Sequence, residues 1–437
     1  MKVLDKTINS WQAGILLFIL LFANKILLLP SLLYEDAAMG AVFVPVILLS
    51  LEMGLLFLFY KIKNKFPNES FATIVRAHCG RVVKIILYVF FAIFFLGKAV
   101  LLYNVTYVFF RNLIYKDAGD FLFLFCFLPI INHLAICGLR TIGRTAQLFF
   151  PVISVICVFC IVVGVFGINS EPLIFDSSAV QIFTATFKHI SSFGDTIFLF
   201  VIMDRVIVKK GQWKVLFSFA GAASFLVIAI TLVFMLSYTY TSFMHSYALF
   251  EIMSFVKEYG GIGRIDIISM VLIIIYAYFH LAIYFKAFMC SFNEIFEGIN
   301  SIYGLLSFNF LFLIIVQLII VNLESAVVYS EKVLPFATIL SFVIVPILAI
   351  ILLCVKRKDS YSFSKTKPKN KIKSEIKKKE KNKEDEKVQS AENMQSAQIS
   401  QNVQSAENDS STDNMQSSNK SPSNNINADR IVQKEAV

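Results

Sequence analysis

The sequence predicts an all-α integral membrane protein with ten transmembrane helices, built as a 5+5 inverted repeat with discontinuous helices 1 and 6. Hydrophobic residues make up 57% of the 437-residue chain, and the mean hydropathy of +0.71 lies far above that of soluble domains. Polar residues interrupt the first and the sixth apolar run at corresponding places, as in transporters that are built from inverted repeats. Together these observations predict a permease-like bundle.

Each expected helix is an apolar run long enough to cross a bilayer, which takes about 20 residues. The ten runs cover residues 11–34, 39–60, 85–110, 121–137, 147–167, 187–208, 214–237, 266–290, 302–322 and 333–355. If the N-terminus is cytoplasmic, most loop Lys and Arg residues fall on the inner side. Both termini are therefore expected in the cytoplasm.

The first run carries Asn24 and Lys25 at its centre, with Ile26 next and Pro30 further on. A lysine near the middle of the bilayer costs about 2.5–3.5 kcal/mol on insertion scales. The helix is therefore expected to unwind here and to line a polar cavity. Two roles are open for Lys25: receiving the carboxylate of a substrate, or pairing with Asp195 across the cavity.

The sixth run contains the stretch "HISSFGDT" at its centre. The residues expected to interrupt the helix are Ser191, Ser192, Phe193, Gly194 and Asp195. Ser and Asp compete with the backbone for hydrogen bonds and disfavour a helix interior. A helix N-terminus freed by such a break points its amides at an anionic substrate group. The alternative is that each break is an isolated kink packed against protein.

Further polar candidates lie on the third and eighth runs. Lys98 is midway along the third run, with Tyr103 further out, and it either faces the central site or forms a structural ion pair. His280 and Tyr284 are four residues apart and share one face of the eighth helix. A buried histidine can also be a packing residue.

Enzymatic motifs are missing from the sequence, which has no G-x-S-x-G, H-E-x-x-H or P-loop pattern. Cys157 and Cys160 form a C-x-x-C without the further ligands that a structural zinc site needs. We therefore expect no enzyme activity, no cofactor and no metal site.

Two domains are expected, a transmembrane domain at 1–355 and a cytoplasmic disordered tail at 356–437. The tail is lysine-rich to about residue 387 and then rich in Ser, Asn and Gln, a composition that cannot bury enough apolar area to fold. Its lysines either bind anionic membrane lipid or are simply solvated. They supply most of the formal net charge of +10, so the charge does not indicate nucleic-acid binding.

Four stretches resemble one known family. They are "ILLLPSLL" (26–33), "FPNESFATIV" (66–75), "SFGDTIFLFVI" (192–202) and "GRIDIISMV" (263–271). In order and spacing they resemble the spore germination permease family, the B subunits of nutrient germinant receptors, within the amino acid/polyamine/organocation permease superfamily. One departure is that Ala23 and Lys25 stand where the superfamily often has Gly-x-Gly, which leaves a backbone-held carboxylate and sodium coupling in question.

The resemblance implies a nutrient sensor in the inner spore membrane. Such subunits bind a small nutrient, often an amino acid, at mid-membrane and act with an A-type membrane subunit and a C-type lipoprotein. Carried over to this sequence, Asn24–Ile26 and Ser191–Asp195 would line the nutrient site. The third and eighth helices would contribute Lys98 or Tyr103 and His280 or Tyr284. The alternative is a free-standing proton- or cation-coupled amino acid permease.

Overall fold

The structure is a computed structural model. It describes residues 7–67, 69–113, 120–166, 168, 177–209, 211–260, 266–297, 301–320 and 329–354. The chain divides into two units, Met1–Lys358 and Asp359–Val437. The expected tail lies outside the described residues, and its disorder and lipid binding stay predictions.

The first expected break is present. Strand β1 (Ile8–Asn9) leads into α1 (Ser10–Phe22). Helix α1 begins with a capping box, in which the backbone N–H of Gln12 donates to Asn9 Oδ1 at 2.8 Å. The α-helix stops at Phe22 and is followed by one 3₁₀ turn, η1 (Ala23–Lys25). Helix α2 (Leu29–Ala37) then starts with a proline in its first turn, where the missing N–H is not needed.

The rest of the first half is a series of helices with short connections. They are η2 (Ala38–Val42), α3 (Phe43–Lys65), α4 (Phe71–Cys79), α5 (Arg81–Leu113), α6 (Asp120–Cys137) and α7 (Leu139–Phe166). Helix α7 begins well before the expected residue 147, because its first turns are polar and fall below the hydropathy of a span. The positive φ of 93° at Gly80 separates α4 from α5.

The second expected break is also present, in a helix that starts earlier than expected. Helix α8 (Ala179–His189) is followed by the turn η3 (Ile190–Ser192), an extended stretch, and the short helix α9 (Ile197–Val201). The expected start at residue 187 was wrong because α8 mixes exposed apolar residues with Gln and Thr. A hydropathy window does not register such a helix.

After α9, the turn η4 (Met203–Arg205) leads into strand β2 (Val206–Ile207). Strand β2 pairs in parallel with β1, with Ile8 opposite Val206. The segment before the first broken helix therefore lies beside the segment that follows the second. No pattern in the sequence predicts this strand pair.

The remaining elements complete the bundle. They are α10 (Trp213–Tyr238), η5 (Thr239–Met244), α11 (Ala248–Gly260), α12 (Asp266–Ile295), α13 (Ser301–Ile320), the π-helical turn η6 (Tyr329–Val333) and α15 (Leu334–Cys354). Helix α11 matches none of the expected spans.

Six segments of the described chain are long and apolar enough to cross a membrane. They are Leu29–Lys65, Arg81–Asn112, Leu139–Phe166, Trp213–Tyr238, Ile267–Ile295 and Glu331–Cys354. Shorter apolar helices cover Ser10–Lys25, Cys126–Cys137 and Ile302–Leu318. The mainly helical membrane fold is thus confirmed, whereas the count of ten crossings in two repeats stays a prediction.

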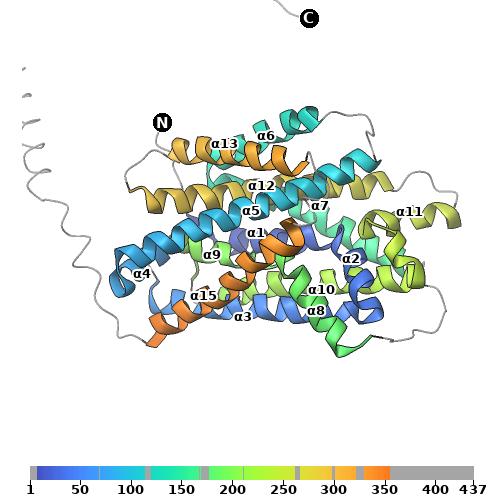
Figure 1. Cartoon of the computed structure of the whole chain (residues 1–437), viewed down its shortest axis with the longest axis horizontal. Coiled ribbons are helices and arrows are strands. Elements are labelled where there is room, and N and C mark those ends of the chain that lie inside the picture. Colours follow the sequence, from blue (N-terminus) through green and yellow to red (C-terminus); the bar gives the residue numbers. More distant parts are fainter. Residues whose placement is uncertain are drawn as a thin grey trace, which may run out of the picture. The chain divides into compact units, whose positions relative to one another are not determined.

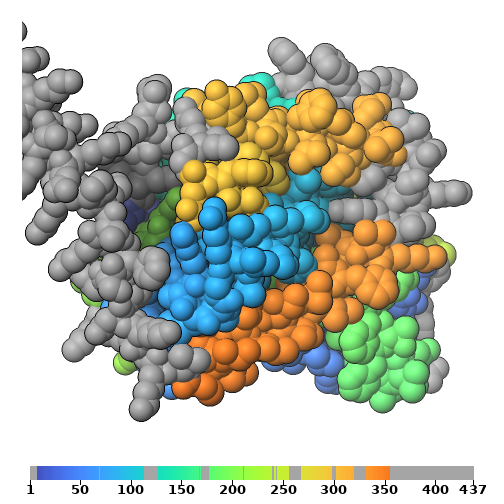
Figure 2. Space-filling model, turned by 60° about the vertical axis from the view of Figure 1, so that its left-hand side comes forward, coloured from blue at the N-terminus to red at the C-terminus, as the bar shows by residue number. Residues whose placement is uncertain are grey.

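Helix α1 lies at the centre of the bundle. It packs along α10, while α12 packs along α5 (Figure 1). All residues of α1 except Trp11 are buried, as expected for a helix that is apolar on every side. The outer helices expose apolar side chains such as Val155, Leu306 and Phe336. Figure 2 shows α5, α15 and α8 side by side on one such face.

Candidate functional site

An ion pair joins the two helix breaks. Lys25 Nζ in η1 lies 2.7 Å from Asp195 Oδ2, and both side chains are completely buried. The same Nζ donates to the carbonyl of Leu20 at 3.2 Å and lies 5.0 Å from the centroid of the Phe193 ring. Of the two roles that the sequence left open for Lys25, the structure shows the pairing with Asp195.

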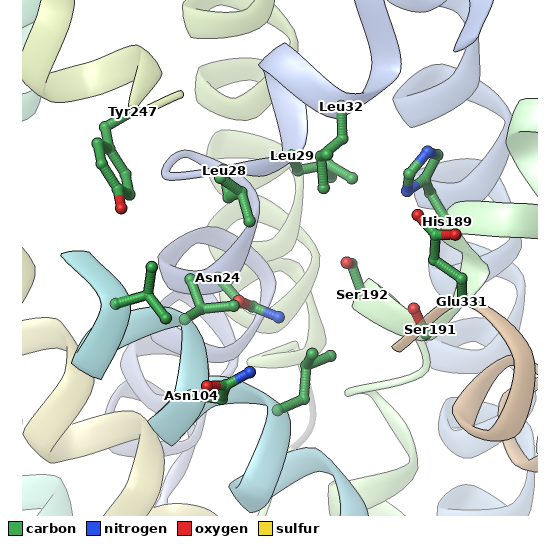
Figure 3. A pocket seen from close by; sticks show the side chains of 13 residues that line it. Asn24, Leu28, Leu29, Leu32, Asn104, His189, Ser191, Ser192, Tyr247 and Glu331 are labelled. Atoms are coloured by element: carbon green, nitrogen blue, oxygen red, sulfur yellow. The ribbon is translucent and has the colours of Figure 1, made fainter. Parts of the chain in front are cut away.

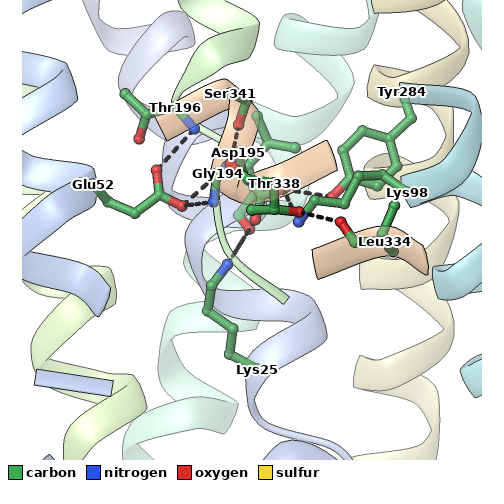
Figure 4. Close-up of polar contacts among 11 residues, drawn as sticks. Lys25, Glu52, Lys98, Gly194, Asp195, Thr196, Tyr284, Leu334, Thr338 and Ser341 are labelled. Carbon is green, nitrogen blue, oxygen red and sulfur yellow. Dashed lines mark hydrogen bonds and ion pairs between the residues drawn. The ribbon is translucent and has the colours of Figure 1, made fainter. Parts of the chain in front are cut away.

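Asp195 has further partners on two other helices (Figure 4). Lys98 of α5 forms an ion pair with Asp195 Oδ1 at 3.1 Å, and the Tyr284 hydroxyl of α12 donates to the same oxygen at 2.6 Å. The His280 ring packs on Tyr284, with 4.5 Å between ring centroids. Neither ring nitrogen of His280 has a hydrogen-bond partner among the described residues.

Glu52 on α3 is a central residue that the sequence reasoning missed. Its Oε1 accepts the N–H groups of Gly194 and Asp195 at 2.5 and 3.0 Å, and its Oε2 accepts the Thr196 N–H at 3.0 Å. The amides that the second break frees are therefore already bound to a carboxylate of this chain. The available signal was a single acidic residue in the middle of the run 39–60, because charges inside a span usually have a function.

Gly194 makes this arrangement possible. Its φ is +93°, a backbone conformation that residues with a side chain rarely adopt. A Cβ at this position would also lie 3.2 Å from Thr338 Cγ2 and 3.3 Å from Phe94 Cζ. The glycine lets the chain turn so that three consecutive amides point at Glu52.

A cavity of about 220 Å³ lies beside this charged cluster, between the two breaks (Figure 3). Asn24 and Asn104 lie on one side, and Ser191, Ser192 and His189 on the other. Its remaining wall consists of Leu28, Leu29, Leu32, Leu101, Val105, Val108, Tyr247 and Glu331. This volume is large enough for several water molecules or a small organic ligand.

Two titratable residues of the cavity wall, His189 and Glu331, are each paired with a charged residue outside the lining. Lys188 Nζ lies 2.9 Å from Asp36 Oδ1 and 3.4 Å from Glu331 Oε1. His189 Nε2 lies 2.6 Å from Asp36 Oδ2. These contacts join α2, the end of α8 and η6, and they leave no unpaired cation among the described residues of the wall.

The expected site residues thus fall into three groups. Asn24, Ser191 and Ser192 line the cavity. Lys25, Lys98, Phe193, Gly194, Asp195, Tyr284 and the adjacent His280 form the charged cluster and its surroundings. Ile26 and Tyr103 are buried but are not part of the cavity lining. The ring of Tyr103 instead packs on Tyr107 and Phe312.

A family model described as spore germination protein matches residues 7–327. No curated protein matches the chain significantly. Among solved structures, the chain is similar to Mhp1, a nucleobase-cation-symport-1 family transporter in a closed conformation with bromovinylhydantoin bound. The TM-score is 0.52 at 13% identity, over 80% of this chain and 78% of that chain.

The chain is also similar to a Na⁺-coupled sialic acid symporter in its substrate-bound outward-open state. The TM-score is 0.50 at 12% identity, over 78% of this chain and 74% of the symporter. Both similarities show a shared transporter fold.

Proposed function

This chain belongs to the spore germination protein family, and from that premise we propose that it is the nutrient-binding membrane subunit of a spore germinant receptor. The observation that carries the proposal is the cavity between the breaks. The side chains of Asn24, Asn104, Ser191 and Ser192 line it and have no hydrogen-bond partner among the described residues. Their polar atoms are accessible from the cavity, so a small molecule bound here would find hydrogen-bonding groups that no other described side chain occupies.

The lining favours a ligand without net charge. Its free polar groups are two amides and two hydroxyls, which donate and accept hydrogen bonds but carry no charge. Its charged members already have partners. Leucine and valine side chains cover the rest of the wall and suit an apolar substituent. A small zwitterionic amino acid with an apolar side chain has this chemistry.

The carboxylate of such an amino acid would lie at the start of α2. The N-cap residue of this helix, Leu28, makes no side-chain capping bond, and both Leu28 and Leu29 line the cavity. The start of α9 offers no such place, because Glu52 already accepts its amides. The first break therefore offers uncapped amides and a helix dipole to an anionic group, and the second does not.

Signalling would follow from a shift between conformations. A ligand that contacts Asn24 on one broken helix and Ser191 on the other stabilises one relative arrangement of the two helices. A ligand can shift such an equilibrium only through its differential affinity for the two states. The favoured state would present a different surface to an A-type membrane subunit and a C-type lipoprotein.

The topology that accompanies this proposal has ten crossings. Helices α1 and α2 form one crossing and α8 and α9 another, while α3, α5, α6, α7, α10, α12, α13 and α15 supply the rest. Both termini then lie in the cytoplasm, or on the core side of the inner spore membrane. The lysine-rich tail would bind anionic lipid at about 1 kcal/mol per lysine.

The second candidate is a free-standing cation-coupled permease. It is favoured by the fold shared with a nucleobase-cation symporter and a Na⁺-coupled symporter. Such a protein would use the same cavity but would carry its ligand across the membrane.

The deciding experiment measures germination of spores that lack this protein, across a panel of amino acids, sugars and salts. Uptake of the same compounds by growing cells is measured in parallel. Loss of the response to one class of nutrient with unchanged uptake would support the receptor. Normal germination with impaired uptake would instead establish the permease.

A further inference from the structure

Four charged side chains meet where the two breaks face each other, and their formal charges balance. Lys25 and Lys98 are the cations, and Asp195 and Glu52 are the anions. Each is at most 1% exposed. With both ammonium groups protonated and both carboxylates ionised, the formal charge of the cluster is zero. A buried cluster is stable only when its charges are compensated in this way.

The ammonium of Lys25 has the ligands that a hard metal cation prefers. It contacts a carboxylate oxygen of Asp195 and the backbone carbonyl of Leu20, in the last turns of α1 before the break. Carboxylate and carbonyl oxygens are also the ligands of hard metal cations in proteins. The position between the two breaks that would suit such a cation is filled by a side chain.

The residues around this position do not fit an added metal cation. Asp195 already contacts three donors and Glu52 three amides. Within the described ranges, no group of three or more His, Cys, Asp or Glu side chains could hold a metal ion. One more positive charge would leave the cluster with an uncompensated buried charge, which is strongly unfavourable.

The geometry points to Lys25 as the resident cation of this bundle, a side-chain ammonium that holds the two broken helices together where another protein would need a bound metal cation. Folding and ligand binding then do not depend on Na⁺ or on any other metal cation. Lys25 acts as a positioning residue, because its ammonium contacts the breaks and does not line the cavity. The inference does not depend on which nutrient binds.

The first test uses the purified full-length protein and Na⁺ as the probe. Its melting temperature is measured in sodium chloride and in choline chloride at equal ionic strength. We expect the same melting temperature in both salts and no further change as sodium replaces choline. A saturable rise specific to Na⁺ would overturn the inference, because a ligand that binds only the folded state stabilises it. No nutrient is present, so the result is independent of the proposed receptor function.

The second test replaces the ammonium chemically. Lys25→Ala removes the atoms of a propylammonium ion, so this variant should melt at a lower temperature and recover part of the loss in propylammonium chloride. Propan-1-ol has the same shape without the charge and should restore nothing. Lys25→Met refills the space without a charge and should be destabilised and not rescued by either compound. Equal recovery with the alcohol, or no recovery in propylammonium chloride, would overturn the inference, and the sodium titration decides the case if Lys25→Ala does not fold.

Discussion

Lys25 Nζ and Asp195 Oδ2 are 2.7 Å apart although 170 residues separate them in the sequence. Each residue sits in the interruption of a helix, and both side chains are fully buried. Each interruption weakens its own helix, but the ion pair between the two interruptions connects the two helices. The cost of placing a lysine at this depth is therefore offset within the protein itself.

Replacing Asp195 by Asn should strongly destabilise the protein. The change leaves the ammonium groups of Lys25 and Lys98 without a counterion, and breaking a buried ion pair by removing one partner costs about 3–5 kcal/mol. The measurement is thermal unfolding in detergent. In the Lys25→Met/Asp195→Asn double variant, the loss should be smaller than the sum of the two single losses, because the residues share one interaction. Additive losses would show that the pair contributes little.

Removing the carboxylate of Glu52 should loosen the second break. Glu52→Ala leaves three buried amides without acceptors, and each such group costs roughly 1–3 kcal/mol unless water enters. Thermal unfolding and proteolysis near residue 194 would report the change. Glu35 is exposed on α2, so Glu35→Ala is the control and should leave the melting temperature nearly unchanged. Equal melting of the two variants would show that water replaces Glu52 freely.

Gly194→Ala should destabilise the protein by about 1–3 kcal/mol. The positive φ of 93° strains any side chain, and the new methyl group would press on Thr338 and Phe94. Gly54 is the matched control, because it lies inside α3 and a Cβ there meets nothing within 4 Å. Gly54→Ala should be neutral or stabilising, as expected for a helix interior. A Gly194→Ala variant as stable as Gly54→Ala would refute the requirement for glycine.

Asn104→Leu should weaken the nutrient response without unfolding the protein. It removes a half-buried amide from the cavity wall. The loss of one hydrogen bond, about 0.5–1.5 kcal/mol, corresponds to a shift of roughly 2–10-fold in the effective nutrient concentration. Dose–response curves of spore germination give this shift. The control is Thr184→Ala, which removes an exposed hydroxyl bonded within α8. An unchanged curve for Asn104→Leu would remove this residue from the site.

Truncation after Lys358 should leave the transmembrane unit intact. The unit Met1–Lys358 forms its own set of internal contacts. The truncated protein is expected in the membrane fraction with the melting temperature of the full chain. Its loss from the membrane would show that the tail contributes to insertion or stability as well as to any binding of lipid.

The sequence by itself determined the class of protein and the positions of the breaks. Apolar runs of spanning length require a membrane environment, because their side chains could not all be buried in a soluble fold. Asn24, Lys25 and the stretch Ser191–Asp195 are unfavourable within an apolar helix, whatever surrounds them. Such local effects can be read along the chain, and so can the motifs that identify the family.

Only the tertiary structure decided which groups meet. Glu52 binds the amides after Ser192, Lys25 binds Asp195 instead of facing the cavity, and Asn104 lines the cavity while the adjacent Tyr103 packs against aromatic rings. Neighbouring residues of a helix point about 100° apart. The packing of α5 against other helices therefore selects which of them reaches the site. Hydropathy and helix propensity depend only on neighbouring residues, so they give no information about a partner that lies far away in the sequence.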